Sequence, residues 1–79
     1  MEWIPENIRL LRLHIGETQE QFAARLGLER RQTVHDWEAG KRNPSGTARK
    51  LMDIIASDYG FTERVAARLK VQRGDDEGG

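Results

Sequence analysis

The sequence contains no cysteine, and its 79 residues include only two histidines. Without cysteine, neither a disulfide framework nor a thiolate metal site can form. The histidines and carboxylates also show no spacing typical of a closed zinc site. We therefore expect a domain that is stabilised by its apolar core alone, with no metal and no cofactor.

Long hydrophobic runs are missing as well. The uncharged apolar stretches are only a few residues long, whereas a membrane-spanning helix needs ~20 apolar residues. Residues 1–5 lack the basic start and the apolar run of a signal peptide. These absences predict a cytoplasmic protein that makes no contact with a membrane.

Catalytic motifs are also absent. We find no nucleophile elbow, no glycine-rich phosphate loop and no paired carboxylates with a pocket, and Ser45 and Ser57 have no evident base. A domain of this size has little room for a ligand pocket. The sequence therefore predicts that the protein is not an enzyme.

The formal net charge is zero, but the charge is unevenly distributed. From Arg25 to Lys50 there are seven basic residues and three acidic ones, and residues 74–79 add three acidic residues. Because partner choice depends on local potential, the middle of the chain is the candidate surface for an anionic partner. The alternative interpretation is a solvated surface of mixed charge.

Apolar residues at spacings of three and four predict five short helices and no strand pair. The expected helices cover residues 5–15, 19–26, 31–39, a segment from about residue 45, and residues 62–70. A capping box formed by Thr18 and Gln21 marks the second start, and Gly27 marks its end. We expect one compact all-α domain over residues 1–73, followed by a disordered acidic tail over residues 74–79.

The expected core consists of the apolar residues that recur on one face of each helix. They are Ile8, Leu11, Ile15, Phe22, Ala23, Leu26, Val34, Trp37, Ala48, Leu51, Met52, Ile55, Val65, Ala66 and Leu69. Trp3 either covers the end of the first helix or lies in a dimer contact. Thr33 offers an alternative cap for the third helix, which would place Gln32 in the turn.

Residues 19–39 have the features of two short helices that cross closely, because Ala23 is small and Gly27 allows a sharp turn. Several short segments between Ile8 and Ile55 carry a resemblance. They are Leu11-Arg12, Thr18-Gln19-Glu20, Phe22-Ala23, Leu26-Gly27, Gln32-Thr33-Val34, Trp37-Glu38, Gly40 and Pro44. Together they resemble the Cro/phage-repressor-type (XRE) helix-turn-helix family, which implies a lambda-repressor-like DNA-binding fold.

Two details refine this resemblance. Residues 37–46, followed by Ala48 and Leu51-Met52, look most like the antitoxin branch, whose members pair with a ribonuclease-type toxin and repress their own operon. The turn between Gly27 and Trp37 is one residue longer than the family pattern. We interpret the longer turn as variation within the family, because some antitoxins of this type share it.

The exposed face of the third helix is predicted to read bases. The candidate base-reading residues are Arg31, Gln32, His35 and Asp36. Arginine suits guanine O6 and N7, glutamine suits adenine N6 and N7, and an aspartate can accept from cytosine N4. Each of these side chains has a plainer alternative role as a solvated surface group.

Phosphate contacts are predicted on both sides of the third helix, where they fix register without reading sequence. The candidates are Thr18, Gln19, Arg30, Thr33, Lys41, Arg42 and Asn43. In the family, the glutamine matching Gln19 clamps the DNA backbone. Arg12 and Glu38 match a pair that forms an internal salt bridge in relatives, so we expect them to be structural.

The expected function is a sequence-specific transcriptional regulator, and more narrowly a repressor. The helix at about 31–39 would enter the major groove of double-stranded DNA, and a homodimer would engage two half-sites. The dimer contact is hypothesised around Phe61, Val65 and Leu69, or near Trp3. A cognate toxin is a further expected partner, and the alternative is a protein-interaction module of the same fold that does not bind DNA.

Overall fold

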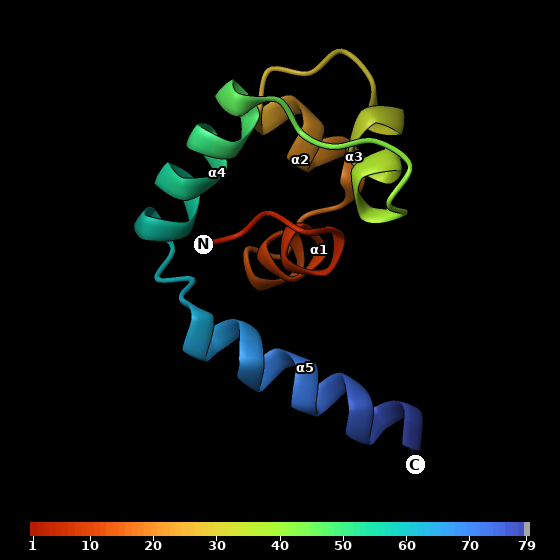
Figure 1. Ribbon diagram of the computed structural model, residues 1–79, viewed down its shortest axis with the longest axis vertical. Helices are drawn as coiled ribbons and strands as arrows, with labels where there is room; N and C mark the ends of the chain where they lie inside the picture. The colour runs from red at the N-terminus through yellow and green to blue at the C-terminus, as the bar shows by residue number, and fades with distance from the viewer. Residues whose placement is uncertain (79) are drawn as a thin grey trace.

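The computed structural model of the chain describes the backbone of residues 1–78 and the side chains of residues 1–71. Within this part it contains five α-helices and no strand (Figure 1), which confirms the predicted all-α class. The helices are α1 (Pro5–His14), α2 (Gln19–Arg25), α3 (Arg31–Glu38), α4 (Gly46–Asp58) and α5 (Glu63–Gly78).

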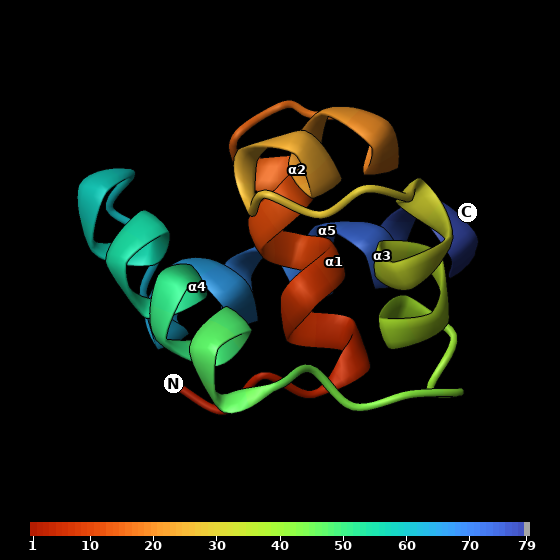
Figure 2. The same cartoon turned by 90° about the horizontal axis from the view of Figure 1, so that it is seen from above.

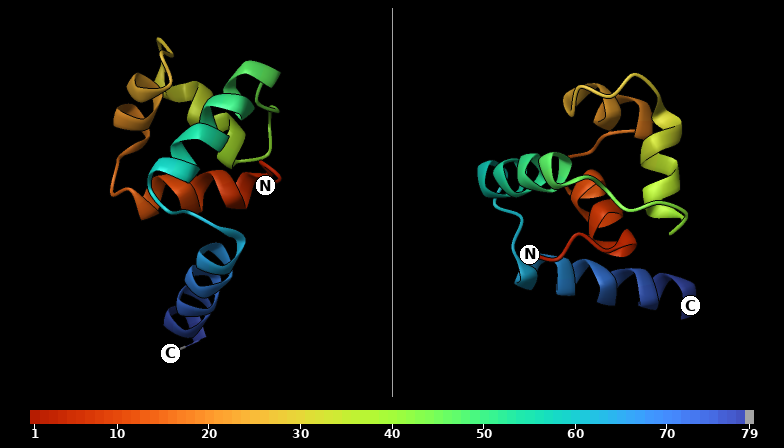
Figure 3. Two further views of the ribbon diagram at one scale, coloured as in Figure 1. Left: turned by 90° about the vertical axis from the view of Figure 1, so that its left-hand side faces the viewer. Right: turned by 45° about the horizontal axis from the view of Figure 1, so that its top comes forward.

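Helix α1 lies in the middle of the fold. Figures 1 and 3 show α2 and α3 on one side of it and α5 on the other, with α4 alongside. Because α1 packs against both α3 and α5, it buries a wide arc that includes Leu10 as well as Ile8 and Leu11. The expected single stripe omitted Leu10, since helical spacing does not reveal a second packing partner.

Helix α4 buries a narrower stripe, formed by Ala48, Met52 and Ala56 at intervals of four. Its first turn is capped by Ser45, whose hydroxyl accepts the Ala48 N–H at 3.1 Å. The prediction that Leu51 belongs to the core is wrong, because this side chain is exposed together with Ile54. Helix α4 therefore presents two neighbouring apolar side chains to solvent.

The N-terminal segment and the start of α5 complete the core. Trp3 stacks on Phe61 with ring centroids 6.4 Å apart, and its indole N–H donates to Asp53 Oδ1 at 2.8 Å. Both aromatic rings are buried, while Val65 and Leu69 pack partly against the core. The two rings themselves have little surface left for a partner, and the hypothesised dimer contact around Phe61, Val65 and Leu69, or near Trp3, stays a prediction.

Helix α5 begins after Thr62, whose hydroxyl accepts the Val65 N–H at 3.2 Å, and it runs beyond the expected end at residue 70. The expected disordered tail, residues 74–79, lies outside the residues whose side chains are described, so it stays a prediction. None of the helices described between residues 1 and 78 is both long and apolar enough to span a bilayer.

Candidate nucleic-acid interface

Helices α2 and α3 pack directly against each other. Phe22 and Ala23 on α2 and Val34 and Trp37 on α3 are buried. The capping box at the start of α2 forms as predicted: the Gln21 N–H donates to Thr18 Oγ1 at 3.1 Å, and the Thr18 N–H donates to Gln21 Oε1 at 2.9 Å. This cap fixes where α2 begins relative to α3.

The longer turn between the two helices is closed by local hydrogen bonds. Gly27 adopts a φ of 72°, a left-handed conformation that strains any residue with a Cβ atom. The next N–H, of Leu28, donates to the Ala23 carbonyl at 2.9 Å, and the Leu28 side chain packs partly against the core. The extra residue therefore lengthens the turn between the two helices, and α3 still packs against α2.

Helix α3 begins at Arg31, with Arg30 at its N-cap and no side-chain cap. The alternative in which Thr33 caps the helix is therefore wrong. The Thr33 N–H instead donates to the Arg30 carbonyl at 3.3 Å within the first turn. This start places Gln32 inside the helix, on its outer face, and not in the preceding turn.

The four candidate base-reading side chains lie on the side of α3 away from its buried residues. Arg31 and Gln32 are exposed, and His35 and Asp36 are half-buried. Gln32 Nε2 donates to Asp36 Oδ1 at 2.9 Å and lies 3.3 Å from His35 Nδ1. The acidic side chain on this face is thus bonded to an amide.

The charge of Asp36 is stabilised locally. The hydrogen bond from Gln32 is the main cause that holds the pKa of Asp36 below its usual range, and the nearby Lys41 charge acts in the same direction. A hydrogen bond to the ionised form favours that form. Asp36 is therefore a carboxylate at neutral pH, and it accepts hydrogen bonds but cannot donate them.

The loop after α3 is attached to the end of that helix. Gly40 adopts a φ of 75°, and the N–H groups of Lys41 and Arg42 donate to the Asp36 carbonyl at 2.9 and 3.3 Å. The Lys41 bond, together with the Gly40 N–H donating to the Trp37 carbonyl at 3.2 Å, is the Schellman arrangement that closes helix C-termini. The exposed side chains of Lys41, Arg42 and Asn43 thus project from a segment whose backbone is fixed to α3.

Arg12 and Glu38 form the ion pair that the resemblance implies. Arg12 Nε donates to Glu38 Oε2 at 2.8 Å, and Arg12 Nη2 donates to Glu38 Oε1 at 3.0 Å. The two side chains are only 12% and 7% exposed. A third donor, Arg12 Nη1, bonds the Glu17 carbonyl at 2.9 Å, so this guanidinium joins α1, the α1–α2 turn and the end of α3.

A hollow of about 260 Å³ lies where α1, the start of α2 and the outer face of α3 meet. It is lined by Arg9, Arg12, Gln19, His35, Glu38 and Ala39. Gln19 Nε2 donates to Glu38 Oε1 at 3.3 Å, which places the predicted phosphate-binding amide beside this hollow. Sequence reasoning missed Arg9, because only the packing of α1 brings its exposed side chain next to Gln19.

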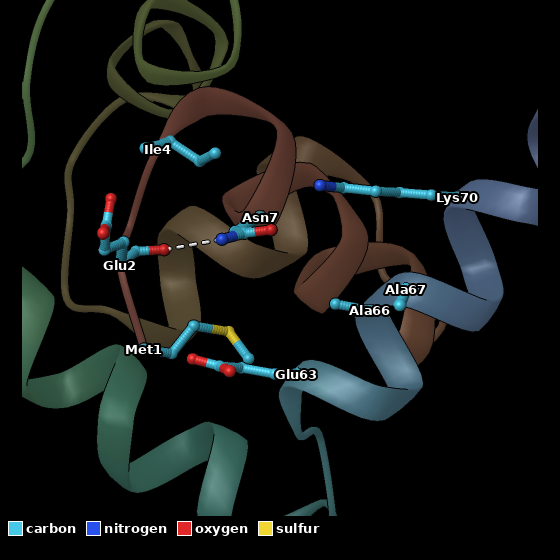
Figure 4. Close-up of a pocket in the computed structure, with 8 residues that line it drawn as sticks. All are labelled: Met1, Glu2, Ile4, Asn7, Glu63, Ala66, Ala67 and Lys70. Carbon is cyan, nitrogen blue, oxygen red and sulfur yellow. Dashed lines mark hydrogen bonds between the residues drawn. The ribbon is translucent and has the colours of Figure 1, made fainter.

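A second hollow, of about 270 Å³, lies on the α5 side of α1 (Figure 4). Its lining contains Met1, Glu2, Ile4, Asn7, Glu63, Ala66, Ala67 and Lys70. Lys70 reaches from α5 toward α1, where its Nζ lies 4.0 Å from Glu6 Oε2. Two glutamates and one lysine give this lining no excess of positive charge, so it is a poor surface for a nucleic acid.

Figure 2 shows the loop between α3 and α4 passing beside the N-terminal segment, and Asn43 and Pro44 share a hollow there with Trp3 and Ile4. Among the described residues, no three histidine, aspartate or glutamate side chains gather where they could hold a metal ion. The basic and amide side chains around α2 and α3 are therefore the strongest candidate site.

Two short helices, closely packed around a glycine turn with a polar outer face on the second, define a helix-turn-helix protein. A family model described as helix-turn-helix matches residues 8–52, which is more than half of the chain. The protein belongs to the Cro/phage-repressor-type (XRE) helix-turn-helix family of DNA-binding regulators. Searches of curated proteins and of solved structures find no match to it.

Proposed function

We propose that this protein is a sequence-specific repressor of transcription that inserts α3 into the major groove of double-stranded DNA. The observation that supports the proposal is that α3 has a buried face and an exposed polar face. Val34 and Trp37 hold the helix on the core, which leaves Arg31 and Gln32 exposed. An α-helix fits the major groove, where these two side chain types discriminate guanine and adenine.

The proposed phosphate contacts flank this helix on two sides. On one side are Lys41, Arg42 and Asn43, which follow α3 directly. On the other are Gln19 and, as an addition from the structure, Arg9, which share one hollow. Contacts of this kind position the protein on the duplex and make its affinity depend steeply on salt. Arg30, Thr18 and Thr33 remain candidates for the same role.

The proposed repressor acts as a symmetric homodimer on two half-sites about one helical turn apart. Leu51 and Ile54 support a dimer contact through α4, because they are exposed apolar neighbours on one helix. Sedimentation of the purified protein with and without duplex tests this. Ile54→Glu should shift a dimer toward monomer, and a wild-type protein that is monomeric both at high concentration and on DNA excludes the dimer.

A narrower proposal places the protein among antitoxins that repress their own operon and bind a ribonuclease-type toxin. The sequence of residues 37–46 supports it by resemblance. Co-expression with the product of the neighbouring gene tests it: a stable complex that neutralises a ribonuclease supports the antitoxin role. A neighbouring product that neither binds nor cleaves RNA rejects it, and the DNA-binding proposal is unaffected.

The rival function is a protein-interaction module that has kept the fold without binding DNA. Asp36 favours this rival, since it places an acidic group on the outer face of α3. Binding to a fluorescent duplex from the protein's own promoter, compared with a scrambled duplex over a series of salt concentrations, separates the two. A repressor prefers the promoter duplex and loses affinity as salt rises, whereas the rival shows no preference at any salt.

Two variants sort the proposed roles. Gln32→Ala should weaken binding by about 1–3 kcal/mol and relax the preference at one base position. Arg42→Ala should weaken all duplexes alike and reduce the salt slope by about 1. If both variants change the same quantity, the division into base-reading and phosphate-binding residues is wrong.

A further inference from the structure

The Gln32 side chain is held by its neighbours before any DNA is present. Its Nε2 lies 2.9 Å from Asp36 Oδ1 and 3.3 Å from His35 Nδ1, and the latter two atoms are 3.6 Å apart. Glutamine and aspartate four residues apart are neighbours on a helix surface. The three atoms therefore form one small cluster on the outer face of α3.

The geometry of this cluster leaves half of the amide free. The three distances make Asp36 Oδ1 and His35 Nδ1 subtend an angle of about 70° at Nε2, while the two N–H bonds of a planar amide diverge by ~120°, so the two N–H groups cannot each point at one of these atoms. One N–H therefore bonds Asp36, and the same N–H also serves His35 Nδ1 in the tautomer that leaves this nitrogen unprotonated. The second N–H and the carbonyl oxygen Oε1 are then available to a ligand.

The identity of the acceptor fixes which way round the amide sits. A carboxylate only accepts hydrogen bonds, so Nε2 must be the atom of Gln32 that faces Asp36. The low pKa of Asp36 keeps the carboxylate ionised, and the backbone of Asp36 is held by the Lys41 and Arg42 N–H groups. Gln32 thus presents one acceptor and one donor in a defined order.

We propose that Asp36 is a positioning residue that makes Gln32 selective for adenine over guanine. This inference rests on the proposed function and deepens it. Adenine offers a donor at N6 and an acceptor at N7 in the major groove, which matches the free Oε1 and the free N–H of Gln32. Guanine offers acceptors at both O6 and N7. Pairing with guanine would demand both N–H groups, and one of them is bonded to Asp36.

The same geometry changes the role predicted for Asp36 itself. A side chain that is already accepting from Gln32 acts on the base through Gln32 and makes no base contact of its own. The carboxylate also repels DNA phosphates. Removal of Asp36 therefore has two separable effects: general affinity rises, and discrimination at one base position falls.

The test begins with selection from a randomised double-stranded DNA library by the purified full chain, which identifies the base position whose enrichment depends on Gln32. Matched duplexes that carry adenine or guanine at this position are then titrated with the protein. The wild-type protein should favour adenine by about tenfold or more. Asp36→Ala should reduce this ratio to less than about threefold, chiefly by improving binding to guanine. Asp36→Asn keeps an acceptor oxygen in place and should retain most of the preference.

Glu29→Gln is the matched control, because it removes one exposed acidic charge from the turn before α3 and should raise affinity for both duplexes equally. Thermal unfolding of each variant checks that the fold is intact. An unchanged adenine preference in Asp36→Ala overturns the inference, and so does an enriched sequence that does not depend on Gln32. If the wild-type protein enriches no sequence at all, the proposed function itself fails.

Discussion

The Arg12–Glu38 ion pair allows a quantitative test of what holds α3 in place. Glu38→Ala would leave the Arg12 guanidinium without its carboxylate in a site where the two side chains are 12% and 7% exposed. Breaking a buried ion pair costs about 3–5 kcal/mol. Because Arg12 keeps its bond to the Glu17 carbonyl and neither side chain is fully buried, we expect a smaller loss of about 2–3 kcal/mol.

The chain contains its own control for this prediction. Arg25 and Glu17 form a pair of similar geometry, with contacts of 2.9 and 2.8 Å, but their side chains are 34% and 16% exposed. Exposed pairs of this kind contribute about 0–1 kcal/mol. Glu17→Ala leaves the backbone carbonyl of that residue unchanged, so it isolates the loss of the more solvated pair.

Thermal and urea unfolding measure both variants. In a domain of this size, each 1 kcal/mol lowers Tm by about 4–8 °C, so Glu38→Ala should lower Tm by about 8–24 °C and Glu17→Ala by at most about 8 °C. Replacing both members of the buried pair, as Arg12→Met with Glu38→Leu, should restore much of the stability. If Glu38→Ala and Glu17→Ala unfold within about 3 °C of each other, burial does not govern these pairs.

Four further substitutions test the packing, the α2 cap and the Trp3 hydrogen bond. Thr18→Ala removes the α2 cap and should reduce the free energy of unfolding by about 1 kcal/mol in urea denaturation. Met52→Ala opens a cavity in the core and should cost about 2–5 kcal/mol, whereas the exposed Ile54→Ala should stay within about 0.5 kcal/mol. Trp3→Phe loses the hydrogen bond to Asp53 and should reduce the free energy of unfolding by about 1 kcal/mol. The fluorescence of Trp37, the tryptophan that remains in this variant, monitors its unfolding.

The features that could be predicted from the sequence are those decided within one or two turns of helix. The capping box of Thr18 and Gln21 lies within four residues, and both of its hydrogen bonds form. Val34 and Trp37 are buried because their spacing places them on one face of a helix. Local chemistry alone determines these outcomes, so no knowledge of the tertiary packing was needed.

The features that could not be predicted depend on which helices meet. Leu10 is buried because α1 packs against both α3 and α5. Leu51 is exposed because only the stripe of Ala48, Met52 and Ala56 on α4 is buried. Arg9 comes beside Gln19 only when α1 is laid against the start of α2. Nothing in helical spacing specifies how many neighbours a helix has.

The acidic residue on α3 shows a different limit. The four-residue spacing of Gln32 and Asp36 is visible in the sequence and favours a hydrogen bond. Arg31 is only one residue further away in the sequence, and a charged partner is the stronger one in general. Only the direction of each side chain decides between them, and that direction depends on where α3 begins, which the longer turn left open.

The packing residues and the exposed residues of α3 lie on different faces, and this affects how such a protein can diversify. Val34 and Trp37 carry the packing, and their neighbours Arg31 and Gln32 are exposed, where substitutions change stability by only about 0.5 kcal/mol. Under the proposed base-reading role of α3, new operator preferences can accumulate on this face without compensating core mutations. A gene duplicate of this protein can acquire a different target while its fold remains intact, which makes the scaffold suited to large sets of regulators that must not cross-react.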